Sequence, residues 1–376
     1  MMRYFSIVLL FMGLGSCFVS CTDDDFPVPA ASTVPKFTYT IDNDEFAPAT
    51  VTFTNTSIVP QAVGEPTYYW NFGNGDSSTE VSPSYTYLEA GAYEVKLVVT
   101  TSASLEVREE IITLVVKDPN AVGTPIYFTN GNQLFQGLIN DQAPIFTPLA
   151  DVAPQAAYEI VYNASDEKLY ISDLDAGKIY RCNTDGSDFE DFRSGLSDPI
   201  GMAIDYDADK LYWTTGSGIQ STDLGSTDVN DREDFVTGQT NDPEGVAIHA
   251  PSGKLFWGNY SGGIWSKNLD GSNETLVIPD IETGSMSVIG DRIYYDEYVG
   301  SGDIRIKSAA LDGTNITTIA TGIGRVVYGI GFDASENKMY WGDRDTDALM
   351  RANLDGSETE LYYQASSDTR GIVIIN

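Results

Sequence analysis

Leu211-Tyr212-Trp213-Thr214 and Met339-Tyr340-Trp341-Gly342 are two copies of one strand pattern, in which an aliphatic residue precedes aromatic residues. The pattern occurs six times, and the other copies are Ile126-Tyr127-Phe128-Thr129, Leu169-Tyr170-Ile171-Ser172, Leu255-Phe256-Trp257-Gly258 and Ile293-Tyr294-Tyr295-Asp296. Their first aromatic positions are separated by 43, 42, 44, 38 and 46 residues. A repeat of this length without a helical pattern is typical of four-stranded propeller blades. Residues 121–376 are therefore predicted to form a six-bladed β-propeller.

A second motif, which contains an Asp-Gly pair, follows most of these strands. It is found at 184–187, 269–272, 311–314 and 354–357. Asp-Gly favours a type I′ hairpin, here between the third and fourth strands of a blade. Blade three departs from the pattern, because its turn is the degenerate Leu224-Gly225-Ser226 and an acidic insert runs from Asp228 to Asp234. The six strands and four turns together resemble the YWTD family of six-bladed propellers, found in lipoprotein-receptor ectodomains.

The two ends of the repeat region indicate how the ring closes. Nothing like the inner strand Gly201-Met202-Ala203-Ile204-Asp205 precedes Ile126, whereas the chain ends with an unaccompanied strand, Arg370 to Ile375. This C-terminal strand is predicted to complete the first blade, which would hide both exposed edges of an open ring. The aromatic residues Trp213, Trp257 and Trp341 are predicted to pack between neighbouring blades.

Residues 35–117 carry a different strand pattern. Trp70-Asn71-Phe72-Gly73-Asn74-Gly75 places two aromatic residues before a turn suited to Gly and Asn, and Gly91 to Leu97 alternates with period two. These two signatures at this spacing resemble the PKD family, which implies an immunoglobulin-like β-sandwich. Asn occupies both acidic positions of the turn, which argues against an ion there. PKD modules of bacterial surface proteins mostly serve as spacers, and Lys117 to Asn120 reads as the linker.

The N-terminus has the pattern of an export signal. Arg3 precedes an apolar stretch from about Tyr4 to Leu14 that is too short to span a membrane. Cleavage before a cysteine resembles bacterial lipoprotein processing, and the acidic run Thr22-Asp23-Asp24-Asp25 favours Cys21 over Cys17 as the acylated residue. We therefore expect a signal peptide at 1–20, a tether at 21–34 and an outer-membrane lipoprotein exposed on a Gram-negative cell. An ordinary secretory signal without lipid is the alternative.

The composition excludes several functional classes. The 376 residues contain 55 Asp and Glu against 21 Lys and Arg, a net charge of −34, which opposes binding to nucleic acid. His249 is the single histidine and aligns with Asp205 at a turn after the inner strand, so we expect a structural role. Cys182 lies in a strand-like stretch and is expected to be a core residue outside any disulfide framework.

The positions that should line the axis come from the start of each inner strand. Counting back from the aromatic strands gives Tyr158, Ile200, Glu244, Tyr328 and Arg370, with Gly284 in a blade five that the spacing predicts to be shorter. Aromatic and charged groups that converge from several blades suit recognition of a ligand. Tyr158, Glu244, Tyr328 and Arg370 are therefore the candidate ligand-binding residues. The alternative is that Glu244 and Arg370 only pair with each other and plug the channel.

Catalytic and metal motifs are not apparent in the sequence. Calcium-dependent lactonases are also six-bladed propellers and hold their ion in an axial cage of Glu, Asn and Asp, whereas Glu244 is the one carboxylate among the axial positions. Asp205 to Lys210 resembles half a calcium loop, but Lys210 stands where Gly is needed. The sequence contains no Gly-x-Ser-x-Gly elbow, phosphate loop or Cys/His cluster. We therefore expect no catalytic residue, metal or cofactor.

The function expected from these observations is binding. The chain is predicted to be a non-catalytic, monomeric cell-surface lipoprotein that binds a protein, peptide or glycan through the axial face of the propeller, with the PKD domain as a spacer. In YWTD relatives, the face around the axis binds short segments of partner proteins. The alternatives are a glycan-capture component of a polysaccharide-uptake system and a lactonase-like hydrolase.

Overall fold

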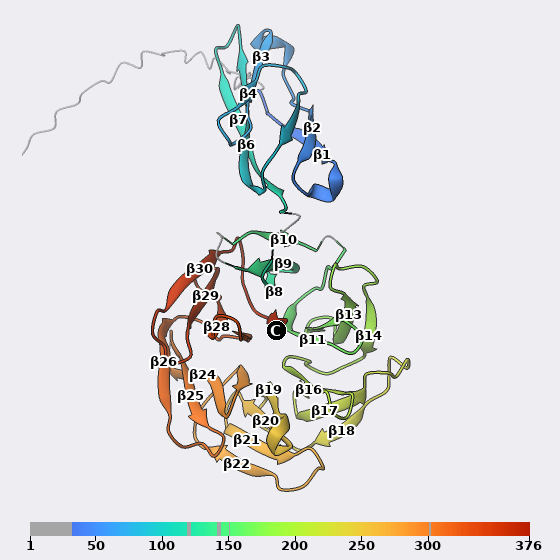
Figure 1. The fold of residues 1–376 in the computed structure, drawn as a ribbon, viewed down its shortest axis with the longest axis vertical. Coiled ribbons are helices and arrows are strands. Elements are labelled where there is room, and N and C mark those ends of the chain that lie inside the picture. The colour runs from blue at the N-terminus through green and yellow to red at the C-terminus, as the bar shows by residue number, and fades with distance from the viewer. Residues whose placement is uncertain (1–31, 119–121, 141–143, 150, 301) are drawn as a thin grey trace, which may run out of the picture. The chain divides into compact units, whose positions relative to one another are not determined.

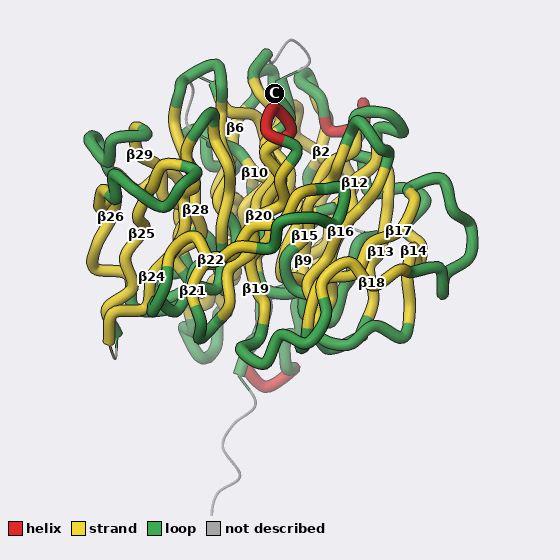
Figure 2. The backbone as a smooth tube through the Cα atoms, turned by 90° about the horizontal axis from the view of Figure 1, so that it is seen from below, coloured by secondary structure: helices red, strands yellow, loops and turns green. Residues whose placement is uncertain are grey.

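A computed structural model describes residues 32–118, 122–140, 144–149, 151–300 and 302–376. The predicted signal peptide with Cys17, and most of the predicted tether with Cys21, lie outside the described residues. The chain forms two compact units that divide between Val116 and Lys117. Both consist of strands and loops, and the helical segments described are the three 3-10 turns η1 (Asn43–Glu45), η2 (Gln61–Val63) and η3 (Ala250–Ser252) (Figure 2). In the described part of the chain, no helix is both long and apolar enough for a membrane span.

The first unit is a sandwich of two antiparallel sheets. One sheet has the order β1 (Phe37–Ile41), β2 (Ala49–Asn55), β5 (Ser84–Tyr87), and the other β4 (Ser77–Ser78), β3 (Pro66–Asn71), β6 (Gly91–Thr101), β7 (Val107–Val116). Trp70 lies fully buried in the core and donates its indole N–H to the Glu80 carbonyl at 3.0 Å. The Asn71 side chain accepts the Gly73 N–H at 2.9 Å, and Gly73 has a positive φ of 83°. Asn at this turn therefore stabilises the backbone in the PKD-like sandwich that the sequence predicted.

The second unit is a six-bladed propeller whose antiparallel four-stranded sheets surround a central axis (Figure 1). From the inner strand outward, blade one contains β31 (Ile372–Ile374), β8 (Thr124–Asn130), β9 (Gln133–Ile139) and β10 (Phe146–Pro148). Blade two contains β11 (Ala157–Asn163), β12 (Lys168–Asp173), β13 (Lys178–Asn183) and β14 (Glu190–Ser194). Blade three contains β15 (Met202–Asp205), β16 (Lys210–Thr215), β17 (Gly218–Asp223) and β18 (Glu233–Val236).

The other three blades follow the same order. Blade four contains β19 (Pro243–His249), β20 (Lys254–Asn259), β21 (Gly263–Asn268) and β22 (Thr275–Ile278). Blade five contains β23 (Met286–Ile289), β24 (Arg292–Gly300), β25 (Asp303–Ala310) and β26 (Thr317–Ile323). Blade six contains β27 (Ile330–Asp333), β28 (Lys338–Asp343), β29 (Ala348–Asn353) and β30 (Glu360–Gln364).

The C-terminal strand closes the ring, as the sequence predicted. β31 pairs antiparallel with β8 through Ile372↔Phe128, Val373↔Tyr127 and Ile374↔Ile126. The first blade is thus built from both ends of the propeller region, which leaves no open inner edge between the first and last blades.

Blade five differs from the prediction of a shorter blade. Its hairpin strands β24 and β25 have nine and eight residues, whereas the corresponding strands of the other blades have six or seven. The short spacing arises before this hairpin, because only Gly290 and Asp291 connect β23 to β24. A tight turn on one side and an extended hairpin on the other therefore replace the expected short blade.

Aromatic residues of the second strands fill the spaces between blades. Trp213 packs in one cluster with Tyr170 and Phe192 of blade two, and Trp257 packs with Tyr212 of blade three. Trp341 likewise contacts residues of blade five, including Ile304. Each tryptophan is at most 1% exposed, so the predicted packing between neighbouring blades is confirmed.

Glycines bring the inner strands close together around the axis. Gly201, Gly245, Gly329 and Gly371 occupy the position after the strand-start residue in four blades. A Cβ at Gly329 would lie 2.6 Å from the Arg370 carbonyl oxygen, and one at Gly371 would lie 2.8 Å from the Tyr158 carbonyl oxygen. This close approach sets neighbouring strand-start residues side by side at one end of the channel.

Candidate binding site at the propeller axis

Two tyrosines and two arginines stack in one cluster at the propeller axis, which we call the axial mouth. The rings of Tyr158 and Tyr328 meet edge to face with 4.7 Å between their centroids. The guanidinium of Arg370 lies 4.6 Å from the centre of the Tyr158 ring, and that of Arg344 lies 4.7 Å from the centre of the Tyr328 ring. Cation–π contacts of this kind hold a guanidinium plane in place. The structure therefore brings three of the four predicted binding residues into one cluster.

Asp368 is the carboxylate around which this cluster is organised. It accepts hydrogen bonds from Arg344 Nε at 2.8 Å and from Arg370 Nη2 at 2.9 Å, and Arg325 Nη1 lies 3.8 Å away. Burial raises the pKa of Asp368, but the hydrogen bonds and charges of Arg344 and Arg370 outweigh burial, so its pKa lies below the ordinary value. Three guanidinium groups thus share one ionised carboxylate.

Glu244, the fourth predicted residue, does not pair with Arg370. Its side chain is buried, with 7% of the residue exposed, and its Oε2 atom has no hydrogen-bond partner among the described residues. The pKa of Glu244 is raised to about 8. Burial is the largest cause, the charges of Asp296 and Asp242 raise the pKa as well, and the charge of Arg344 opposes the increase. Arg370 binds Asp368 instead. The alternative in which Glu244 and Arg370 plug the channel as a pair is therefore wrong.

Asp296 lies beside Glu244 and has a structural role. Its Oδ1 atom accepts the N–H groups of Gly284 and Ser285, both at 2.8 Å, and its Oδ2 atom accepts the Val327 N–H at 3.2 Å. Burial raises the pKa of Asp296 to about 6, although these hydrogen bonds oppose the shift. Asp296 therefore fixes the entry to the inner strand of blade five, while Glu244 keeps an unused polar atom.

The remaining axial positions, Ile200 and Gly284, have no polar or charged side chain. Ile200 is buried, and Gly284 leaves space for the Glu244 carboxyl, because a Cβ there would lie 2.7 Å from Oε2. Arg325, Arg344 and Asp368 were not predicted from the sequence, and they lie in loops rather than at strand starts. The loop before each inner strand and the turn after each second strand reach the same face of a propeller. A search of these loops and turns for charged residues in every blade would have identified all three.

The residues assigned structural roles are held by local contacts. His249 Nδ1 lies 2.8 Å from Ser252 Oγ, and the aligned Asp205 accepts the Asp207 N–H at 3.1 Å within its turn. Cys182 is fully buried, and burial raises the pKa of its thiol to about 12. Among the described residues, no group of three or more His, Cys, Asp or Glu side chains is placed to hold a metal ion.

Parts of this chain are similar to known families and proteins. Residues 33–116 match the family model of the PKD domain. Curated relatives include protein cueball of Drosophila erecta, 29% identical over 149 residues, which are 37% of this chain and 23% of that protein. The vitellogenin receptor of Solenopsis invicta is 27% identical over 139 residues, which are 36% of this chain and 8% of that protein. The matched segments thus span at most a quarter of these relatives.

Solved structures match the propeller more broadly. A chain in the crystal structure of a nidogen/laminin complex has a TM-score of 0.59 at 14% identity, and the match covers 68% of this chain and 99% of that chain. TolB from Acinetobacter baumannii has a TM-score of 0.52 at 10% identity, with 76% and 80% covered. These likenesses show the fold. The N-terminal unit thus matches the PKD domain family, and the C-terminal unit shares its propeller fold with these structures.

Proposed function

We propose that this chain is a non-catalytic binding protein whose propeller holds an anionic group of its ligand at the axial mouth. The observation that carries the proposal is the convergence of Arg325, Arg344 and Arg370 on the single carboxylate of Asp368. These three cations share one carboxylate in a chain whose net charge is −34. Such a cluster of guanidinium groups attracts an anion to the mouth.

The guanidinium groups suit an anion such as a carboxylate. The Nε and Nη2 groups of Arg344 and Arg370 donate to Asp368, and the stacked tyrosines hold both guanidinium groups in fixed orientations, so these two residues attract an incoming carboxylate mainly by their charge. The side chains of Arg344 and Arg370 are 8% and 17% exposed, whereas that of Arg325 is 47% exposed. Arg325, whose Nη1 donates to the Arg344 carbonyl at 3.2 Å, is the most exposed of the three guanidinium groups and is therefore the one that an incoming group contacts.

Glu244 supports the same assignment. With its pKa raised to about 8 by burial, the carboxyl is mostly protonated at neutral pH and does not repel an anion. A protonated carboxyl also supplies an O–H donor, and its Oε2 atom has no partner among the described residues. The mouth therefore combines fixed cations with a neutral acid, an arrangement suited to binding rather than to holding a metal cation.

A protein ligand is favoured over a glycan at this mouth. The vitellogenin receptor, one of the matched relatives, is named as a receptor. An acidic segment of a partner protein would supply the required carboxylates.

The proposal also includes a location. The chain would be exported, carry a lipid at Cys21 and be a surface-exposed outer-membrane lipoprotein, with the PKD domain as a spacer.

The location is tested at the cysteines. Cys21→Ser is expected to abolish fatty-acid labelling and release the protein from the membrane fraction, whereas Cys17→Ser is expected to keep both. Labelling of cells with radioactive palmitate, followed by fractionation, measures this. Labelling that survives Cys21→Ser and is lost in Cys17→Ser would assign the lipid to Cys17.

The binding proposal is tested on an array of acidic peptides, each paired with an amidated copy in which Asn and Gln replace Asp and Glu. The purified chain is expected to bind acidic peptides, to lose them in the amidated copies and to lose them in Arg344→Ala. Arg181→Ala, which removes a guanidinium paired with Glu190 at 2.7 Å in blade two, is the matched control. Equal binding to both peptide sets would contradict an anion site.

A further inference from the structure

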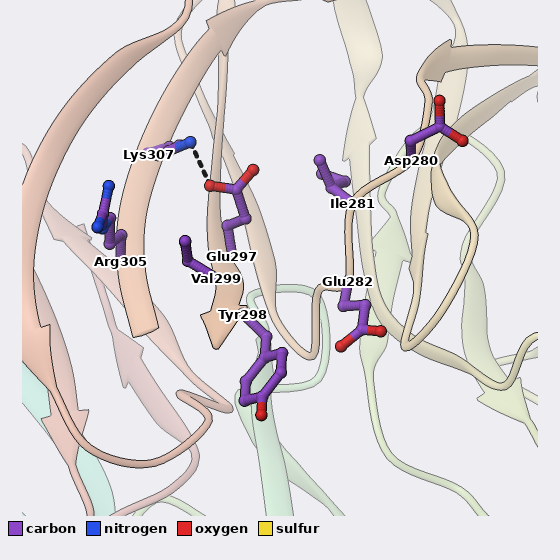
Figure 3. Close-up of a pocket in the computed structure, with 8 residues that line it drawn as sticks. All are labelled: Asp280, Ile281, Glu282, Glu297, Tyr298, Val299, Arg305 and Lys307. Carbon is purple, nitrogen blue, oxygen red and sulfur yellow. Dashed lines mark ion pairs between the residues drawn. The ribbon is translucent and has the colours of Figure 1, made fainter. Parts of the chain in front are cut away.

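A groove separate from the axial mouth lies between blades four and five. It has a volume of about 450 Å³, within the range of about 300–1,000 Å³ common for small-ligand sites. One wall is the loop after β22, with Asp280, Ile281 and Glu282, and the other is the long hairpin of β24 and β25 (Figure 3). The hairpin contributes Glu297, Tyr298, Val299, Arg305 and Lys307. The groove exists because this hairpin extends beyond those of the other blades.

Hydrogen bonds hold both walls in place. The Tyr298 N–H donates to the Glu282 carbonyl at 3.0 Å, which ties the end of β24 to the opposite loop. The Gly263 N–H of blade four donates to the Ile281 carbonyl at 2.9 Å, which fixes the loop from its other side. Glu297 lies directly opposite Arg305 in the β24–β25 register, and Tyr295 lies opposite Lys307. The polar groups of the hairpin wall are therefore preorganised before a ligand binds.

The cations of the groove are neutralised within the protein. Lys307 forms an ion pair with Glu297, drawn as a dashed line in Figure 3. Arg305 pairs with Asp303, with 2.7 Å between Nη2 and Oδ2. Asp280 and Glu282 form no ion pair among the described residues, so the groove repels an anionic ligand and offers carboxylate acceptors to the hydroxyl or ammonium groups of a ligand. An apolar ligand would remove these charges from water without replacing their hydrogen bonds, which is costly.

A ligand rich in hydroxyl groups satisfies these constraints. Each hydroxyl both donates and accepts, so neighbouring hydroxyls bridge a carboxylate and an ammonium without separating the pair. Tyr298 is 36% exposed at the rim and offers an amphipathic ring beside these polar groups. We infer that this groove is a binding site for a neutral saccharide, independent of the anion site at the axis.

The test is calorimetric titration of the full chain with short linear neutral oligosaccharides of glucose, xylose, galactose and mannose. Free amino acids and dipeptides form a second arm, since a zwitterion is the competing ligand class. At least one oligosaccharide is expected to bind, and Tyr298→Ala and Glu297→Gln are each expected to weaken it about tenfold or more, because hydrogen bonds to charged groups and ring contacts are lost. Arg370→Ala, at the axial mouth, is expected to leave saccharide binding unchanged.

The matched control is Glu358→Gln, which alters a carboxylate paired with Lys338 at 3.1 Å in blade six. This variant is expected to bind the oligosaccharide as the unaltered chain does. If Glu297→Gln lowers the thermal midpoint, Tyr298→Ala decides the question, because its ring is partly exposed and the substitution leaves the ion pairs intact. Absence of oligosaccharide binding, binding that survives Tyr298→Ala, or binding of amino acids and dipeptides alone would overturn the inference.

Discussion

At the residue scale, Asp368 and Glu244 show how two carboxyl groups near one axis acquire opposite properties. Asp368 is held ionised by Arg344 and Arg370, whereas Glu244 is buried without a hydrogen-bond partner for its Oε2 atom among the described residues. The difference lies in the immediate partners, since Arg344 influences both groups but donates hydrogen bonds to Asp368. Asp368 therefore anchors the two guanidinium groups at neutral pH, while Glu244 stays mostly protonated.

The raised pKa of Glu244 predicts a pH-dependent cost to stability. The folded-state pKa of about 8 exceeds the ordinary value of 4.5, so the folded state binds the proton more tightly than the unfolded state. Below the ordinary value the group costs nothing, and the destabilisation grows as the pH rises toward about 8. Glu244→Gln, which cannot ionise, is expected to gain stability relative to the unaltered chain over this interval. Thermal midpoints measured across the interval test this, and a difference that does not change with pH would contradict it.

The residues of the mouth were only partly predictable from the sequence. Tyr158, Tyr328 and Arg370 follow from the repeat register, because equivalent strand positions meet at the axis. Arg344 and Asp368 lie in loops of variable length, where the register no longer fixes which side chains meet.

The environment of Arg193, outside the mouth, also could not be predicted. This residue is fully buried, and its guanidinium lies 3.9 Å from the centre of the Phe192 ring. Its partners come from the turn of the next blade, which the sequence does not place beside it.

At the scale of the element, the inner strands depend on residues without side chains. An added Cβ at Gly201 would clash with the Glu244 carbonyl oxygen and lie 3.0 Å from the Val246 backbone nitrogen. These neighbours are backbone atoms of the next inner strand and cannot move aside as a flexible side chain can. The spacing between blades three and four is therefore set by this glycine.

Gly201→Ala is accordingly expected to destabilise the propeller by about 1–3 kcal/mol, the usual cost of overpacking. Gly225→Ala is the matched control, because a Cβ there meets no heavy atom within 4 Å and the residue does not have a positive φ. Urea denaturation of both variants measures the difference. Equal stability of the two variants would show that the inner strands can separate without cost.

The elements themselves were predicted with more success than their lengths. The six aromatic strands are all second strands of blades, because the aliphatic and aromatic residues that fill the spaces between blades must recur once per blade. The spacing of 38 residues before Tyr294 suggested a short blade five, but spacing does not distinguish a tight turn from a short hairpin. The groove that follows from the extended hairpin was therefore invisible in the sequence.

At the scale of the whole molecule, the propeller is held closed by a short segment. β31 supplies three residue pairs to β8, and β31 itself lies against the inner strands of blades two and six. Removal of this strand exposes the inner edge of β8 and opens the ring at its junction.

Deletion of Gly371 to Asn376 is expected to abolish folding of the propeller while leaving the N-terminal sandwich intact. The chain divides into two compact units, so scanning calorimetry that resolves one unfolding transition for each unit measures both outcomes. A thermal midpoint of the propeller that does not change on truncation would show that closure does not need β31.

The reverse deletion tests whether the propeller folds alone. The chain divides into two compact units between Val116 and Lys117, and the aromatic clusters of the propeller contain no residue of the sandwich. Removal of residues 22–118 is therefore expected to leave the thermal midpoint of the propeller unchanged. A large loss of stability would reveal dependence between the units.

The most direct measurement for the proposed function is the affinity of the Tyr328→Ala/Arg370→Ala double variant for an acidic peptide that the unaltered chain binds. Each substitution removes one stacked anchor of the mouth, and truncation of such anchors commonly costs about 1–3 kcal/mol. The account predicts that calorimetric titration shows binding weakened by about tenfold or more, with the thermal midpoint nearly unchanged. Full binding by the double variant would contradict it and place the peptide site away from the axis.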